Sequence, residues 1–207
     1  MHRENRLTPY FSILTCIASG MKTRAEIENE LANNNIGPYL VKLEDYYKVI
    51  TKSLPIFAKE NSKKVRYQLN DCFLIFWFRF FYKYQALVEN KALKSLGEII
   101  RRDYSGVSGF MMERYFMKKF QEEGRYIIGK WWDRKGGNEI DLIIADPIQK
   151  EAWIYELKKQ GYRYKENEFR EKVDTVLEQT PELRKMTIHL GSLGSADFPG
   201  ACFVDSK

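Results

Sequence analysis

The stretch GNEIDLIIADPIQKEAWIYELKK, residues 137–159, constrains the fold more than any other part of the chain. Its two apolar runs alternate with a period of two residues, which is typical of β-strands. Asp146 and Pro147 between the runs form a turn signal. We therefore predict a β-hairpin, in a register that sets Asp141 opposite Glu156 and Glu139 opposite Lys158.

Charged residues interrupt this hairpin on one face of each strand. Alternation predicts that Asp141 shares a face with Ile143, and that Glu156 and Lys158 share a face with Ile154. The other face of the hairpin is then apolar, and its members are Ile140, Leu142, Ile144, Trp153, Tyr155 and Leu157. Directly opposed residues have Cβ atoms ~4.5–5.5 Å apart. Asp141 and Glu156 are therefore predicted to reach one Mg²⁺ or Mn²⁺ ion.

A third carboxylate comes from the predicted helix GVSGFMMERYFMKKFQEE, residues 106–123. On a helical wheel, Glu113 falls in the middle of the apolar stripe that contains Phe110, Phe116, Met117 and Phe120. A carboxylate that faces a core is costly unless it is paired or bound to a metal. Glu113 is therefore a candidate additional metal ligand or an orienter of metal-bound water. The alternative is a buried salt bridge, for example to an arginine.

The scarcity of histidine and cysteine argues against several kinds of chemistry. The chain has only two histidines, His2 and His189, and three well-separated cysteines without a metal-ligand spacing. Serine–histidine catalysis, cysteine–histidine catalysis, a zinc knuckle and a disulfide framework are therefore all poorly supported. Catalysis by this chain would have to use carboxylates and lysine.

Positive charge is concentrated in the N-terminal part of the 207-residue chain. Residues 1–70 carry 11 basic and 7 acidic side chains, residues 71–105 carry 6 and 4, and residues 106–207 carry 17 of each. This excess permits nucleic-acid contact. No apolar run is long enough to cross a bilayer, because Arg79 and Lys83 interrupt the most aromatic stretch. We expect a soluble, cytoplasmic protein.

Residues 1–70 have the pattern of a winged helix-turn-helix. Three helical stretches, the second opening with a Thr23–Glu26 capping box and the third with Pro38 near its start, precede two extended runs around the polar turn KENSKK. In such a module the third helix enters the DNA major groove and the wing contacts phosphates. The candidate nucleic-acid-binding residues are Lys42, Lys63, Lys64 and Arg66. The alternative is a protein-docking module, because Glu44 and Asp45 reduce the positive charge of the third helix.

Residues 71–105 are predicted to form a helical bridge. Asp71 is a candidate N-cap for a helix crowded with aromatic residues, which at this density are usually core. Residues 106–207 then form the third segment, with strands predicted at RYIIGKWW and KMTIHL and a helix at KENEFREKVDTVLEQTPEL.

Two strand carboxylates, a helix glutamate and a lysine are the groups that phosphodiester hydrolysis requires. The acids would bind a divalent ion, and Lys158 would stabilise the charge of the transition state. The order of helix with Glu113, strand, strand with Asp141, strand with Glu156-x-Lys158, helix and strand resembles the PD-(D/E)XK nuclease superfamily. This resemblance implies a restriction-endonuclease-like α/β domain with a mixed sheet, inside an α+β chain.

The motifs YQLNDCFLIFWFRFF, GFMMERYF, IGKWWDRKGGNEIDLIIAD and IYELKK resemble the C-terminal region of unknown function in archaeal-type AAA-fold ATPases. That resemblance implies a winged helix joined to a nuclease-like domain, normally preceded by an ATPase domain. The chain has no G-x-x-x-x-G-K-[ST] phosphate loop. ATP binding is therefore not carried over, and an ATPase would be a missing domain or a separate partner.

Three functions remain open at this point. The first is an Mg²⁺-dependent DNA nuclease with Asp141, Glu156, Glu113 and Lys158 in its site. The second is a non-cleaving docking or regulatory module for an ATPase. The third is a winged-helix transcription regulator. The complete acid–acid–lysine set favours the nuclease. The zero net charge of residues 106–207 counts against tight DNA binding by that segment alone.

Overall fold

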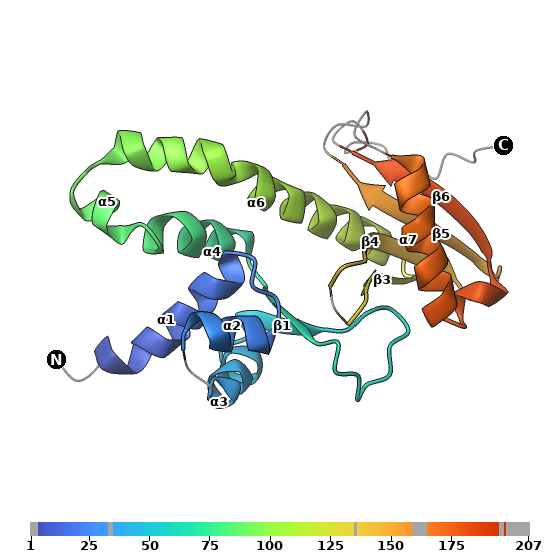
Figure 1. The fold of residues 1–207 in the computed structure, drawn as a ribbon, viewed down its shortest axis with the longest axis horizontal. Coiled ribbons are helices and arrows are strands. Elements are labelled where there is room, and N and C mark those ends of the chain that lie inside the picture. Colours follow the sequence, from blue (N-terminus) through green and yellow to red (C-terminus); the bar gives the residue numbers. More distant parts are fainter. Residues whose placement is uncertain (1–3, 33–34, 135, 159–164, 195–196, 198–207) are drawn as a thin grey trace. The chain divides into compact units, whose positions relative to one another are not determined.

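The computed structural model describes residues 4–32, 35–134, 136–158, 165–194 and 197 and has a mixed α+β fold (Figure 1). The chain forms two compact units. The first consists of Met1–Ser53 and Val65–Val107, and the second of Leu54–Lys64 and Ser108–Lys207. Relative to the predicted segments 1–70, 71–105 and 106–207, residues 54–64 lie with the second unit and residues 71–107 with the first.

The first unit begins with four short helical elements. They are α1 (Glu4–Ala18), α2 (Arg24–Glu30), α3 (Gly37–Val41) and η1 (Lys42–Tyr46), a π-helical turn that continues α3. At the start of α2, the Thr23 hydroxyl accepts the Glu26 N–H, and the Glu26 carboxylate accepts the Thr23 N–H. Pro38 lies in the first turn of α3. The capping box and the proline position were both predicted correctly, because their causes are local.

The predicted N-terminal hairpin exists, but its strands are shorter than expected. Strands β1 (Ile50–Ser53) and β2 (Arg66–Leu69) pair antiparallel, with Ile50 opposite Leu69. The predicted extension of both strands to a turn at residues 59–64 is wrong. Residues 54–64 leave the hairpin and belong to the second unit.

Contacts with strand β3 (Ile127–Trp132) explain the course of residues 54–64. The Ile56 N–H donates to the Lys130 carbonyl at 2.8 Å, and the Trp132 indole N–H donates to the Lys64 carbonyl at 3.1 Å. Ile56 is buried in the core of the second unit, and a Cβ at Gly129 would lie 3.0 Å from the Ile56 Cβ. Residues 54–64 therefore pack on strand β3 of the second unit and do not form a hairpin turn of the first unit.

The rest of the first unit is helical. After the N-cap Asp71 come α4 (Cys72–Phe76), η2 (Trp77–Tyr82), α5 (Gln85–Glu89) and α6 (Leu93–Glu122), and α6 continues into the second unit. Phe80 is buried as predicted and Phe78 is buried too, but Phe73 is 66% exposed and Trp77 is 43% exposed. The prediction that the aromatic residues of this segment are core therefore holds for only some of them.

The second unit contains a four-stranded sheet in the order β3-β4-β5-β6. Strands β4 (Glu139–Asp146) and β5 (Glu151–Leu157) form the predicted hairpin, and β6 (Thr187–Leu193) pairs with β5 in parallel. The predicted hairpin register is correct from Leu142 with Tyr155 to Asp146 with Glu151. The ladder ends at these two pairs, so the predicted pairs of Asp141 with Glu156 and of Glu139 with Lys158 are not part of it. Between β5 and β6 lie α7 (Glu166–Gln179) and the 3-10 turn Leu183–Lys185. In Figure 1, α7 runs across the sheet.

Each face of the sheet packs against a different helix. The face towards α7 joins Trp131, Ile140, Ile143, Ala145, Ala152 and Ile154 to Phe169, Val173 and Val176 of α7. The other face joins Leu142, Ile144, Trp153, Tyr155 and Leu157 to Met112, Phe116 and Phe120 of α6. Sheet residues therefore bury apolar side chains in two layers, which is the usual solution for a sheet between helices.

A β-bulge interrupts β4 at Asp141. Gly129 pairs with Ile143, but Trp131 pairs with Ile140, so two residues of β4, Asp141 and Leu142, stand against Lys130 alone. The extra residue resets the alternation of side chains. Ile140 therefore lies in the same cluster as Ile143, and the prediction that it shares a face with Leu142 is wrong.

Long apolar helices are missing from the part of the chain that the structure describes. Within it, no helix combines the length and the apolar composition needed to cross a bilayer.

Candidate active site

Asp141 lies where the β4–β5 ladder ends. The last ladder pair at this end is Leu142 with Tyr155. One residue further, the Asp141 Oδ2 atom accepts the backbone N–H of Leu157 at 2.9 Å, so the side chain takes the place of a ladder carbonyl. The bulge at Asp141 and this hydrogen bond hold the half-buried carboxylate beside the end of β5. Bulges commonly redirect a side chain in this way next to active sites.

Glu156 is a buried carboxylate with unequal oxygens. The side chain of Lys158 contacts its Oε1 atom at 2.7 Å and that of Lys172, from α7, contacts the same atom at 3.5 Å. The Oε2 atom is buried and has no hydrogen-bond partner among the described residues. The hydrogen bond to Glu156 holds the pKa of Lys158 above its ordinary value. A buried carboxylate oxygen without a donor is costly and calls for an explanation, such as a ligand.

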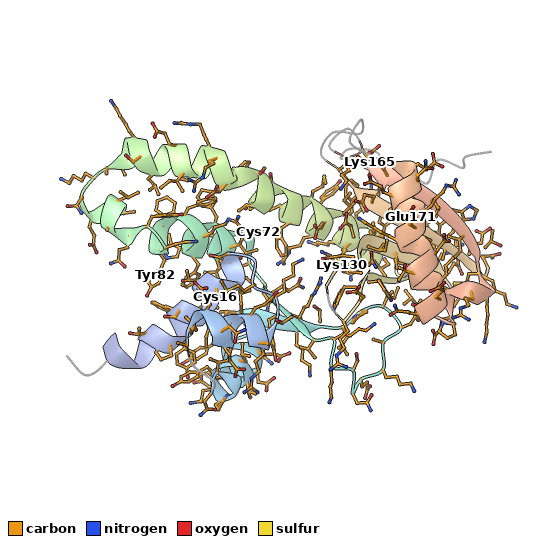
Figure 2. The ribbon with its side chains drawn as sticks, viewed as in Figure 1. Cys16, Cys72, Tyr82, Lys130, Lys165 and Glu171 are labelled. Carbon is orange, nitrogen blue, oxygen red and sulfur yellow. The ribbon has the colours of Figure 1, made fainter. Side chains whose placement is uncertain are left out.

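Glu113 reaches the same region from α6. Its carboxylate forms an ion pair with the ammonium group of Lys130 in β3, and both side chains are largely buried. Figure 2 labels Lys130 on its strand. The alternative of a buried salt bridge at Glu113 is therefore present in the structure, with lysine in place of arginine.

These charges come together around Asp141. Burial is the main cause that raises the pKa of Asp141 to about 6, and the nearby carboxylates of Glu113 and Glu156 raise it further. The N–H of Leu157 and the ammonium of Lys130 act in the opposite direction. We call the six residues Glu113, Lys130, Asp141, Glu156, Lys158 and Lys172 the carboxylate–lysine cluster. A carboxyl group with a perturbed pKa among other charged groups is typical of a functional site.

The carboxylate–lysine cluster offers oxygen donors, which suit Mg²⁺ and Mn²⁺. Among the described residues, no three or more His, Cys, Asp or Glu side chains gather in a group that could hold a metal ion. Glu113 is paired with Lys130, whereas Asp141 and Glu156 are neighbours at the end of the hairpin. Mg²⁺ commonly uses one or two protein carboxylates and completes its shell with water and phosphate. The free Oε2 atom of Glu156 and the raised pKa of Asp141 fit such a two-carboxylate site.

The predicted nucleic-acid-binding residues are divided between the two units. Lys42 is exposed in η1, and Arg66 is half-buried in β2 of the first unit. Lys63 is exposed in the second unit, where Lys64 lies 5.2 Å from the centre of the Trp131 ring and donates to Gln179 at 3.3 Å. The structure therefore gives Lys64 a packing role and does not collect the four residues on one unit.

Sequence reasoning missed two members of the cluster, Lys130 and Lys172. Lys130 is a charged residue inside the apolar strand IIGKWW, the same signal that singled out Asp141. Lys172 flanks the buried stripe of α7, three residues after Phe169 and next to Val173. Both signals were present in the sequence, but neither indicates which carboxylate the lysine contacts.

Comparisons with known proteins add a family resemblance. Residues 77–173 match the sequence profile of DUF234, described as archaea bacterial proteins of unknown function. The chain is also 34% identical over 162 residues to an uncharacterized protein, MJECL04, of Methanocaldococcus jannaschii, a match that covers 73% of this chain and 36% of that relative. No solved structure matches the chain. The chain thus spans little more than a third of that relative, and the region similar to DUF234 contains the whole carboxylate–lysine cluster.

Proposed function

We propose that the second unit is a nuclease-like domain of the PD-(D/E)XK type that hydrolyses DNA with Mg²⁺ or Mn²⁺. The observation that carries this proposal is the pair of neighbouring carboxylates at the end of the β4–β5 hairpin. One of them, Asp141, has a pKa raised to about 6, and the other, Glu156, has a buried oxygen without a donor. Such a pair is unfavourable alone and becomes favourable around a cation.

Each residue of the cluster would have a distinct task. Asp141 and Glu156 would hold the metal ion, and the Leu157 N–H fixes the orientation of Asp141. A divalent ion bound at such carboxylates supplies a polarised phosphate and a water of lowered pKa. The Lys158 ammonium would stabilise negative charge on the phosphate in the transition state. Glu113, held by Lys130, would orient metal-bound water.

The order of the elements supports the same proposal. Along the chain, α6 with Glu113 precedes β3, β4 with Asp141, β5 with Glu156 and Lys158, α7 and β6. The first three strands are antiparallel neighbours and the last is parallel. This is the succession that the nuclease superfamily resemblance implies, although the fold alone does not determine an activity.

The first unit would serve as a winged helix that binds DNA or a protein partner. Its support is the succession of three helical stretches and a two-stranded hairpin. The candidate contacts on this unit are Lys42 in η1 and Arg66 in β2.

One observation favours a second function, a non-cleaving module associated with an AAA-fold ATPase. Glu113 and Glu156 are both neutralised by lysines, as they would be in a domain that has given up metal chemistry. The matched archaeal relative is also much longer than this chain, which leaves room for another domain there.

Incubation with supercoiled plasmid and Mg²⁺ or Mn²⁺ separates the two functions. The wild-type protein should nick or linearise the plasmid, and Asp141→Asn and Lys158→Ala should each lose this activity. Asp174→Asn, an exposed carboxylate of α7, is the matched control and should cut normally. An intact plasmid with all proteins, together with retained duplex binding, would favour the non-cleaving module.

A further inference from the structure

Two lysines contact one carboxylate oxygen of Glu156, at unequal distances. Lys158 at 2.7 Å already neutralises Glu156, and Lys172 contacts the same Oε1 atom at 3.5 Å. The carboxylate of Asp141 also acts on Lys158, so the two lysines face two carboxylates and the formal charges balance. The Lys172 contact is longer than the ~2.7–2.9 Å of a strong charge-assisted hydrogen bond. Lys172 is therefore the more weakly held of the two cations on Glu156.

The packing of α7 explains how Lys172 reaches the sheet. Phe169, Val173 and Val176 are buried and anchor the helix on the sheet. At 100° per residue, Lys172 lies about 60° to one side of Phe169, at the border of this apolar stripe. Its side chain is 34% exposed, so part of it is accessible from solvent.

Other basic side chains near the start of α7 behave differently. Lys165 pairs with Glu168 at 2.6 Å, and Arg170 pairs with Glu166 at 2.7 Å. Both pairs are local and well exposed, and such pairs contribute little energy. The Lys172 contact instead leaves the helix and ends on a candidate metal ligand.

We propose that Lys172 is a second phosphate-binding residue of the site, which rests on Glu156 until a nucleic-acid phosphate replaces that contact. This inference deepens the proposed nuclease function and rests on it for the identity of the substrate. The long, flexible lysine side chain suits the exchange, because it is a movable point charge with three donors. Binding of a cation by Glu156 would weaken the hold on Lys172 and leave its charge for the phosphate.

A binding experiment tests this role without relying on cleavage. Lys172→Met, Lys172→Arg and the matched control Arg170→Met are titrated with Mn²⁺ by calorimetry. Removal of a competing cation should increase the Mn²⁺ affinity of Lys172→Met about three- to tenfold. Arg170→Met should bind Mn²⁺ like the wild type. A purely structural role for Lys172 would instead lower Mn²⁺ affinity and the thermal midpoint together.

The same variants are then titrated with a short fluorescent DNA duplex in Ca²⁺ at several salt concentrations. Lys172→Met should reduce the dependence of log affinity on log salt by about one, as expected for one lost phosphate contact. Lys172→Arg should restore it, and Arg170→Met should leave it unchanged. An unchanged slope in Lys172→Met, or no duplex binding by the wild type, would overturn the inference. If the Lys172→Met variant shows the expected loss of salt dependence but the wild-type protein does not cut plasmid, only the proposed nuclease activity would be wrong.

Discussion

The two ends of strand β4 carry aspartates in opposite situations. At the turn, Asp146 is 1% exposed and accepts hydrogen bonds from Arg125 and from the backbone N–H groups of Ile148 and Gln149. These donors hold its pKa below the ordinary value. At the open end, Asp141 accepts one backbone N–H, and its pKa is raised to about 6. Hydrogen-bond donors therefore dominate at the turn end, whereas burial and the carboxylates of Glu113 and Glu156 dominate at the open end.

This difference separates a structural carboxylate from a candidate functional one. Both aspartates belong to the same strand and both are at least half-buried. At Asp146 the hydrogen-bond donors outweigh burial and lower the pKa, whereas at Asp141 burial outweighs the Leu157 N–H donor and the neighbouring carboxylates add to it. Natural proteins leave polar groups unsatisfied mainly at functional or strained sites.

Cleavage is where the two ends should differ most. Asp141→Asn should reduce Mn²⁺-dependent plasmid cutting by at least ~10²-fold, because a metal ligand is lost. Asp146→Asn should retain cutting within a factor of a few, measured at a temperature where both variants are folded. Equal losses in the two variants would remove the functional distinction between the ends.

Thermal unfolding should show the reverse order. The lowered pKa of Asp146 contributes stability above the pKa of the unfolded chain, and this contribution is lost as the pH falls through the lowered value. Asp146→Asn should therefore lower the thermal midpoint at pH 7 by several degrees and have little effect in strong acid.

Asp141 should act on stability with the opposite sign. Its raised pKa means that the folded protein binds this proton more tightly, so stability falls as the pH rises from about 4 to about 6. Asp141→Asn cannot ionise and can still accept the Leu157 N–H. It should be about 1–3 kcal/mol more stable than the wild type at pH 7.5. A lower unfolding free energy at that pH would contradict the raised pKa.

Metal binding should depend on pH through the same proton. A cation must displace the proton of Asp141, whose pKa is about 6. The affinity for Mn²⁺ should therefore rise about tenfold between pH 5 and pH 7 and then level off. Calorimetry at the two values measures the effect, and Asp146→Asn should show the same rise as the wild type. An Mn²⁺ affinity that does not change between pH 5 and pH 7 would show that Asp141 is not a metal ligand.

The smallest expected effect concerns the ion pair between Glu113 and Lys130, which lies near Asp141. Glu113→Gln removes a like charge and should lower the pKa of Asp141, whereas Lys130→Met removes an opposite charge and should raise it. An NMR pH titration of the Leu157 amide, which donates to Asp141, reports both shifts. Each shift should be smaller than the effect of burial. Shifts of the same sign would show that the ion pair acts through structure and not through charge.

Local patterns were sufficient to predict the hairpin but not its irregularity. The alternation of residues 137–159 and the turn at Asp146 and Pro147 predicted the register that pairs Leu142 with Tyr155. The bulge at Asp141 was missed, because an extra residue in one strand exists only relative to its partner, β3. The same limit applies to Lys130 and Lys172, whose partners lie on other elements.

The apolar residues around Ile56 were misassigned for a similar reason. Their composition favours a strand of the N-terminal hairpin. In the structure Ile56 and Phe57 instead lie in a turn, and Phe57 has a positive φ of 60°. Their packing partners, Trp131 and the α7 stripe, lie far along the chain. Local propensity therefore gave no sign that this segment completes another core.

The insertion of residues 54–64 into the second unit also bears on biosynthesis. Lys64 and its hydrogen-bond partner Trp132 are 68 residues apart, so on the ribosome this segment emerges well before the strand it covers. Until β3 is synthesised, Ile56 has no core to enter, and such waiting apolar segments are vulnerable to wrong association. A fragment that starts at residue 106 would lack this cover for Gly129 and Trp131 altogether. Truncations intended to isolate the sheet should therefore carry residues 54–64 with them.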